Sequence, residues 1–158
     1  MTRAGVEELL TAGGIGPPPI LGFGVTGALR EWYAEGDEEE LEYVAMDLAA
    51  QACVQLLAAR TEDQVGARPR RMVLALDTDR VTPDAEHTRG SVQIDAVISS
   101  RQVAALHADT DDAADDVAAA VAVVRGGGPR DGDEQFVVDA CAAHELAWFA
   151  TQEIPDLL

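Results

Sequence analysis

One long amphipathic segment, residues 38–59, sets the main restriction on how this chain can fold. Apolar residues recur along it with the 3.6-residue spacing of one α-helical face, at Leu41, Val44, Ala45, Leu48, Ala52 and Leu56. Asp37, followed three residues later by Glu40, matches the capping box that begins many helices. The glutamates of the first turn lie where the helix dipole favours negative charge. We expect this helix to pack across one face of a sheet.

Shorter patterns along the rest of the chain predict strands and further helices. Residues 72–76 are apolar on both faces, which is typical of a central strand that is covered on both sides. Apolar and polar residues alternate over 92–98, as in a strand with one wetter face. The other predicted strands are 20–25, 103–107, 135–138 and 146–151. The other predicted helices are 3–12, 26–34 and about thirteen residues that begin at Asp111. A short turn or helix is predicted at 99–102.

Interleaved strands and helices of this kind predict the α/β or α+β class. We expect a single globular domain, 1–158, with a mixed sheet of about five strands covered by three or four helices. Segments 71–77 and 91–98 are predicted to be adjacent strands. Loops near 61–70, 78–90 and 126–134 are predicted to be flexible because they are polar or rich in glycine and proline.

Acidic residues dominate the charge of the chain. Its 158 residues include 29 Asp plus Glu and 11 arginines, with no lysine, and the formal net charge is −18. Binding to phosphate backbones or anionic lipids needs clustered basic residues, so we expect neither nucleic-acid nor membrane binding. An acidic surface made for a basic partner is one explanation of this charge. The favoured explanation is a GC-rich genome, which depletes lysine and asparagine codons and enriches aspartate.

The sequence also predicts where the protein resides. The longest apolar run, 72–76, is far shorter than the ~20 residues of a membrane helix, and no secretory signal opens the chain. Cys53 and Cys141 lie among alanines without CxxC spacing, which favours buried thiols in a reducing compartment over a zinc or redox site. We therefore expect a cytoplasmic protein with no cofactor.

Two histidines and two carboxylates form a candidate for metal or acid–base chemistry. His107, Asp109, His144 and Glu145 could supply two imidazoles and two carboxylates to one zinc or iron ion. No HExxH spacing is present, and nothing in the sequence shows that the two segments meet. Structural histidines are therefore the favoured interpretation.

Three other charged patterns have structural explanations. Asp77 and Asp79 follow an apolar strand, as in haloacid-dehalogenase-like phosphatases, but that chemistry needs a lysine, so an acidic turn is favoured here. The carboxylates of residues 109–116 lack the glycine and glutamate of an EF-hand loop and are predicted to stabilise the start of the next helix. The basic cluster at residues 68–71 is predicted to pair with the protein's own carboxylates.

Five of the seven aromatic residues lie in two short segments. Trp32, Tyr33 and Tyr43 flank the start of the long predicted helix, and Trp148 and Phe149 lie near the C-terminus. Core packing is the favoured explanation of both segments. The alternative is an aromatic patch that recognises a partner, and on that hypothesis the binding residues are Trp32, Tyr33, Trp148 and Phe149.

The same two segments resemble the signature of an uncharacterised actinobacterial protein family, a domain of unknown function. The resemblance depends on REWYAEGDEEELEY at 30–43 and HELAWFATQEIPDLL at 144–158, and would cover nearly the whole chain. It implies a bacterial cytoplasmic protein from a GC-rich genome and carries over no catalytic residue, substrate or cofactor. Family members begin with an apolar strand before the first helix, whereas this chain starts almost at the helix. A missing strand would leave a sheet edge unpaired.

Two functions from different classes follow from these observations. The first is a non-enzymatic protein-interaction or regulatory module with an acidic surface, which predicts exposed aromatic side chains beside carboxylates. Its partner would be another protein, with a homo-oligomer as a further option. The alternative is a small metal- or ligand-dependent enzyme that uses His107, Asp109, His144 and Glu145, or the Asp77 and Asp79 pair, and this predicts that those side chains converge in one cleft.

Overall fold

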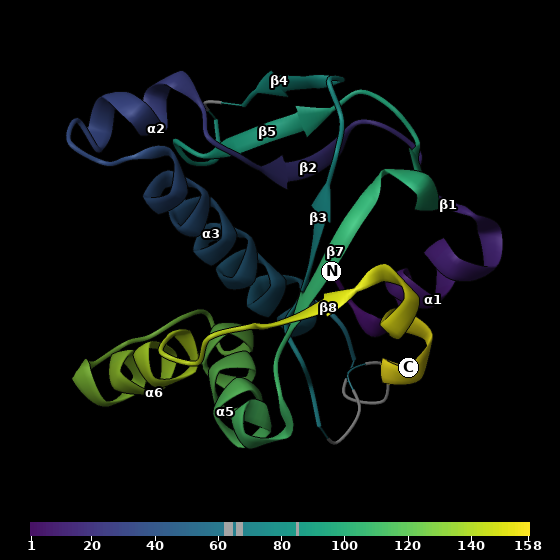
Figure 1. Cartoon of the computed structure of the whole chain (residues 1–158). Helices are drawn as coiled ribbons and strands as arrows, with labels where there is room; N and C mark the ends of the chain where they lie inside the picture. Colours follow the sequence, from purple (N-terminus) through teal and green to yellow (C-terminus); the bar gives the residue numbers. More distant parts are fainter. Residues whose placement is uncertain (62–64, 66–67, 85) are drawn as a thin grey trace.

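The computed structural model of the chain describes residues 1–61, 65, 68–84 and 86–158 (Figure 1). Helices and strands are interleaved along the chain and form a single domain of mixed α and β structure, so the predicted fold class is confirmed. The strands are shared among three small antiparallel sheets, which corrects the expectation of one mixed sheet of about five strands.

Each sheet combines strands that are far apart in the sequence. The largest in extent has the order β3–β7–β8, from Met72–Leu76, Val103–Ala108 and Ala147–Ala150. The second has the order β2–β5–β4, from Ile20–Phe23, Ser91–Ile94 and Val81–Pro83. The third pairs β1 (Gly14–Ile15) with β6 (Ile98–Ser99).

The predicted adjacency of 71–77 and 91–98 is wrong. β3 pairs with β7, while the second segment divides into β5 and β6, which belong to the other two sheets. Alternation of apolar residues reports which face of a strand is buried, and it contains no information on which strand lies beside it. The pairing is decided by the tertiary arrangement.

The helices follow the predictions with one exception. They are α1 (Arg3–Ala12), α2 (Gly27–Trp32), α3 (Glu38–Ala58), α5 (Ala114–Arg125) and α6 (Gly132–Ala142), with 3₁₀ turns η1 (Ser100–Gln102), η2 (Asp111–Ala113) and η3 (Thr151–Leu157). The strand predicted at 135–138 is wrong, because these residues lie inside α6. Asp131 caps this helix by accepting a hydrogen bond from the Glu134 N–H at 2.9 Å, and α6 packs on α5. This packing outweighs the strand propensity of Phe136 and the two valines after it.

The three loops that were predicted to be flexible differ in how much of them the structure describes and in the secondary structure that they contain. Residues 62–64 and 66–67 of the first loop lie outside the described residues. The second contains β4, and residue 85 of it is also not described. α6 begins inside the third, at Gly132.

α3 begins at the predicted capping box. The Asp37 side chain accepts a hydrogen bond from the Glu40 N–H at 3.0 Å, and the Glu40 carboxylate accepts one from the Asp37 N–H at 3.1 Å. The helix contacts β2, β3, α5 and α6 (Figure 1), and toward its end the Cys53 sulfur accepts a hydrogen bond from the N–H of Met72 in β3 at 3.4 Å. Its second half buries Cys53, Val54 and Leu57, whereas Leu56 of the predicted stripe is 43% exposed. The buried face is rotated there because α5 and α6 pack against it.

Among the described residues, α3 is also the one helix that is long and apolar enough to cross a membrane, by length and composition only. The core helices of other folds pass the same test, and 33% of its most apolar window is buried. Its contacts with two sheets and with α5 are those of a core helix.

Two apolar clusters form the core. One fills the space between α3, α5 and α6 and includes Cys53 and Cys141, which are buried and free, as predicted. The other lies between α1, η3 and the β3–β7–β8 sheet, around Val6, Met72 and Leu106. Neither cluster contains a residue of α2. Leu29 is the one residue that α2 buries, and the aromatic side chains at the end of this helix belong to neither cluster.

Candidate functional site

The connection from α2 to α3 presents three aromatic side chains to solvent. α2 has only six residues and buries one of them, Leu29, whose N–H donates a hydrogen bond to the Thr26 hydroxyl at 3.1 Å. Tyr33 ends the helix, and its N–H donates to the Leu29 carbonyl at 3.0 Å. A helix this short has a single buried position, so Trp32 and Tyr33 face outward.

The rings contact each other and a nearby arginine. Trp32, Tyr33 and Tyr43 are 59%, 39% and 60% exposed. The Trp32 and Tyr33 rings meet edge to face, with centroids 4.7 Å apart and planes at 87°, an arrangement that aromatic quadrupoles favour. The Arg89 guanidinium, from the turn between β4 and β5, lies 4.9 Å from the centre of the Trp32 ring, within cation–π distance. We call Trp32, Tyr33, Glu35, Glu40 and Tyr43 the α2–α3 corner.

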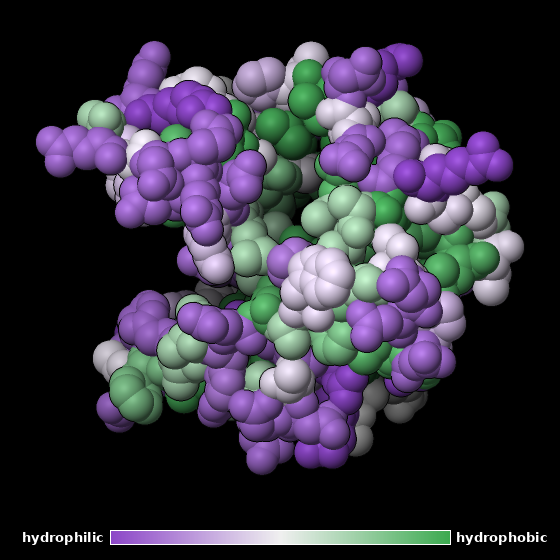
Figure 2. Space-filling view, in the orientation of Figure 1, coloured by the Kyte–Doolittle hydropathy of each residue, from purple (hydrophilic) through white to green (hydrophobic). Residues whose placement is uncertain are grey.

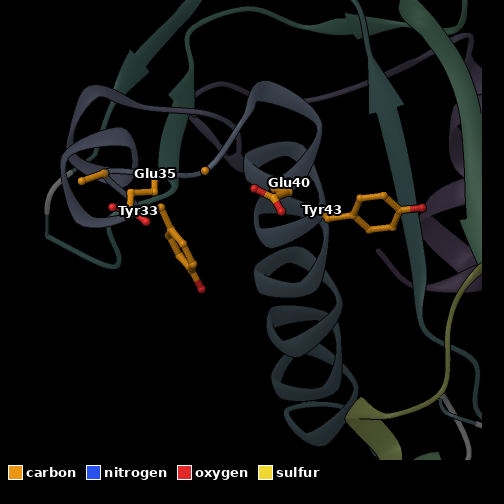
Figure 3. Close-up of a pocket in the computed structure, with 6 residues that line it drawn as sticks. Tyr33, Glu35, Glu40 and Tyr43 are labelled. Carbon is orange, nitrogen blue, oxygen red and sulfur yellow. The ribbon is translucent and has the colours of Figure 1, made fainter.

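An open hollow of about 810 Å³ lies in this corner. It is lined by Tyr33, Ala34, Glu35, Gly36, Glu40 and Tyr43. Figure 3 shows the Tyr33 ring and the Glu40 carboxylate beside the same open space between the end of α2 and the start of α3, while the Tyr43 ring projects from α3 in the direction away from Tyr33. In the space-filling view, polar residues dominate the lobe around α2, and a notch separates this lobe from the one around α6 (Figure 2). We call the open space between the end of α2 and the start of α3 the α2–α3 hollow.

The charge of the hollow is negative. Arg30, the nearest arginine in the sequence, donates a hydrogen bond to Glu38 at 2.7 Å, and this bond raises the pKa of Arg30 and lowers the pKa of Glu38. Among the ion pairs of the described residues, none includes Glu35 or Glu40. The two carboxylates that line the hollow therefore remain available to a cation.

A second polar group of side chains is buried near the end of the β3–β7–β8 sheet. The Arg71 and Asp109 side chains are 3% and 0% exposed and form an ion pair of 2.6 Å. The Asp109 carboxylate also accepts a hydrogen bond from the Arg71 N–H at 2.6 Å, and the Arg71 guanidinium donates another to the His144 carbonyl at 2.8 Å. Burial by itself would lower the pKa of Arg71, but the hydrogen bonds and charge of Asp109 raise it. The pair links β3, β7 and the segment that leads into β8.

The structure does not bring together the four residues of the alternative metal site. Asp109 is already bonded to the buried arginine, and the His144 imidazole contacts Asp116 through Nε2 at 2.7 Å. His107 lies half-buried on β7, where burial lowers its pKa, and Glu145 is exposed. Within the described part of the chain, no three His, Cys, Asp or Glu side chains gather so that they could hold a metal ion.

The other charged patterns have the structural roles that were predicted for them. Asp77 and Asp79 are exposed after the end of β3. Arg70 forms an ion pair with Asp111, and Arg68 lies 4.0 Å from the same carboxylate. The basic cluster therefore pairs with the protein's own carboxylates. The acidic residues after position 110 occupy the first turns of η2 and α5.

Of the four residues that were predicted to bind a partner, the structure brings Trp32 and Tyr33 together. Trp148 is 61% exposed but lies on β8, and Phe149 beside it packs against the core cluster around Leu106. Successive residues of a strand face opposite sides of a sheet, so these last two cannot share a binding face.

Three residues of the corner were missing from the prediction. Glu40 and Tyr43 are three residues apart in α3, a spacing that places side chains on the same helix face. The capping box and this spacing together could have identified them. Glu35 has no such signal, because it lies in the connection between the helices, whose path depends on how α2 is anchored.

A family model described as a family of unknown function matches residues 1–158. The match therefore covers the α2–α3 corner. No curated protein and no solved structure matches the chain.

Proposed function

The chain belongs to this family, DUF6912, and we propose that it is a non-enzymatic protein-interaction module that binds a partner through the α2–α3 corner. One observation carries the proposal: Trp32, Tyr33 and Tyr43 are exposed around a hollow that carboxylates line. Tryptophan and tyrosine are the residues that most often dominate binding energy once a partner covers them. The predicted combination of exposed aromatic rings with neighbouring carboxylates is present at this corner.

The exposed area of the three rings is large enough to support binding. An aromatic side chain buries roughly 150–250 Å², and covering the exposed part of these three would release about 6–10 kcal/mol at about 25 cal/mol per Å². Association consumes a substantial part of this free energy, because the partners lose translational and rotational freedom. The three rings can therefore supply part of the binding free energy of a reversible complex, and contacts around them must supply the rest.

The charge of the chain favours a positively charged partner surface. A net charge of −18 repels phosphate-rich partners and attracts basic ones over several ångströms of solvent. A second copy of the chain fits the corner poorly, because it would bring the same carboxylates against one another. The composition also supports a cytoplasmic protein of actinobacterial origin, since lysine and asparagine are absent and the two cysteines stay free.

The enzyme alternative has less support. Of its proposed residues, Asp109 and His144 bond other protein groups, and Asp77 and Asp79 stand exposed after β3. Catalytic side chains need to converge on one reacting atom, and the described residues offer no such convergence at these positions.

Site-specific photocrosslinking in the native host tests the proposal. A photoreactive phenylalanine analogue is placed at position 33 or 43, and at Phe136 as a control, since Phe136 is 72% exposed on α6. We expect positions 33 and 43 to crosslink one identified protein that Phe136 does not. The purified partner should then bind the unlabelled protein at least about tenfold more tightly than it binds Trp32→Ala. Equal crosslinking from Phe136, or unchanged affinity for Trp32→Ala, would overturn the proposal.

A further inference from the structure

We propose that the α2–α3 hollow is a receptor for the guanidinium group of an arginine in a basic segment of the partner. This inference rests on the proposed function, because it names the chemical group that the corner binds. A guanidinium stacks on aromatic faces and forms charge-assisted hydrogen bonds with carboxylates. Tyr33 and Glu40 offer these two features to one open space (Figure 3).

The surface around the hollow already binds two of the protein's own arginines in these two ways. Arg89 lies over the Trp32 ring at 4.9 Å, and Arg30 donates a hydrogen bond to the Glu38 carboxylate at 2.7 Å. Tyr33 lies next to Trp32 in the sequence and contacts its ring, yet no cation–π contact among the described residues includes Tyr33. The hollow therefore offers an aromatic ring and a carboxylate, the two kinds of group that bind these arginines, and no described arginine makes a cation–π contact with its Tyr33 ring.

The Glu40 carboxylate is held in place before any ligand arrives. Its Oε2 accepts the hydrogen bond from the Asp37 N–H that closes the capping box of α3. Its Oε1 accepts no hydrogen bond from the described residues, so it can receive one from a guanidinium N–H. A group that is already ordered loses less entropy when a ligand binds.

Gly36 keeps the space between ring and carboxylate free. A Cβ at this position would lie 3.4 Å from the Cβ of Tyr33 and 3.7 Å from Oε2 of Glu40, which are ordinary van der Waals distances. An alanine therefore fits at residue 36 without displacing its neighbours. A longer side chain would extend into the hollow and compete with the ligand.

Short basic peptides test the inference on the purified full-length chain. The probe is an acetylated, amidated peptide in which arginines alternate with glycines, and its control has citrulline at every arginine position. Citrulline keeps a planar urea but has no charge. In low salt we expect the arginine peptide to bind at least about fivefold more tightly than the citrulline peptide, by titration calorimetry. We also expect it to shift the NMR signals of the Tyr33 ring.

Matched variants locate the binding. Glu40→Gln removes one charge and keeps an oxygen for the Asp37 N–H, so the helix cap is retained. We expect it to weaken arginine-peptide binding by about three- to fivefold. Glu42→Gln removes the same charge from an exposed position of the same helix, two residues from Glu40 and therefore on another face, and should change binding by less than about twofold. Gly36→Met should weaken binding, and Gly36→Ala should not.

The outcomes separate this inference from the proposed function. Equal losses in Glu40→Gln and Glu42→Gln would show diffuse attraction to the acidic chain and would overturn the inference. Equal binding of the arginine and citrulline peptides would overturn it as well, while a crosslinked partner at position 33 would leave the proposed function standing. Arginine-specific binding at the hollow without any crosslinked partner would support the inference and refute the proposed function.

Discussion

The buried ion pair between Arg71 and Asp109 leads to a quantitative prediction about stability. Asp109→Asn keeps an oxygen for the Arg71 N–H and removes the negative charge that neutralises the guanidinium. The guanidinium then stays buried with two neutral acceptors, the new amide and the His144 carbonyl. A buried charge without a counter-charge is strongly unfavourable, because it has left water without a replacement for its hydration.

The magnitude follows from the burial of both side chains. Arg71 is 3% exposed and Asp109 is 0% exposed, so solvent neither screens the pair nor reaches the cation after the substitution. Breaking a buried pair of this kind costs about 3–5 kcal/mol. For a domain of this size each kcal/mol corresponds to about 2–4 °C in Tm, so we expect Tm to fall by about 6–20 °C.

Urea unfolding followed by far-UV circular dichroism measures this loss. The control is Asp111→Asn, whose side chain is 64% exposed in its ion pair with Arg70 and should cost less than about 1 kcal/mol. The double variant Arg71→Met with Asp109→Leu removes both charges and should recover at least half of the lost stability. A cost below about 1 kcal/mol for Asp109→Asn, or a double variant less stable than the single one, would refute the reasoning.

Three further measurements test other parts of the structure. Hydrogen bonds from Arg130 lower the pKa of Glu134 to about 2. Their stabilising effect is therefore fully present above the unfolded-state pKa of Glu134 and is lost as the pH falls through about 2. A carboxyl NMR titration with a midpoint near 4.3 would contradict this. Leu29→Ala, at the buried residue of α2, should cost about 2–5 kcal/mol in urea unfolding, whereas Leu56→Ala, at a 43% exposed residue, should cost less than half as much. Cys53 and Cys141 are buried, and burial raises the pKa of Cys141, so a thiol reagent at pH 8 should label neither until urea unfolds the chain. Rapid labelling of the native protein would show that this core cluster is open.

Elements with strong local signals were predicted correctly. The capping box at Asp37 and Glu40 begins α3 within the hydrogen-bond geometry that the sequence implies. The apolar run at 72–76 forms β3 with the predicted bounds, but β3 lies at the edge of its sheet and not at the centre as predicted. The segment 135–138 was assigned the wrong structure because its local preference for a strand competes with a cap at Asp131 and with packing on α5. Tertiary contacts outweigh weak propensities in such cases.

The candidate site was predicted in part. Trp32 and Tyr33 were identified from the clustering of aromatic residues, although core packing was the favoured explanation of that pattern. Exposure at Trp32 follows from the brevity of α2, which buries Leu29 alone. Successive side chains of a strand point to opposite faces, so Trp148 and Phe149 point in opposite directions. The prediction that both belong to one binding patch could therefore have been avoided.

The sequence by itself determined local structure where the signal is strong: the start of α3 at its capping box, the bounds of β3, and the large negative charge of the chain. These properties depend on neighbouring residues, whose interactions are present before the chain is compact. Only the tertiary structure decided the strand partners, the pairing of Arg71 with Asp109 and the exposure of the α2–α3 corner. Each of these depends on residues far apart in the chain, and their contacts form only when burial of the whole core offsets the entropy of closing the loops between them.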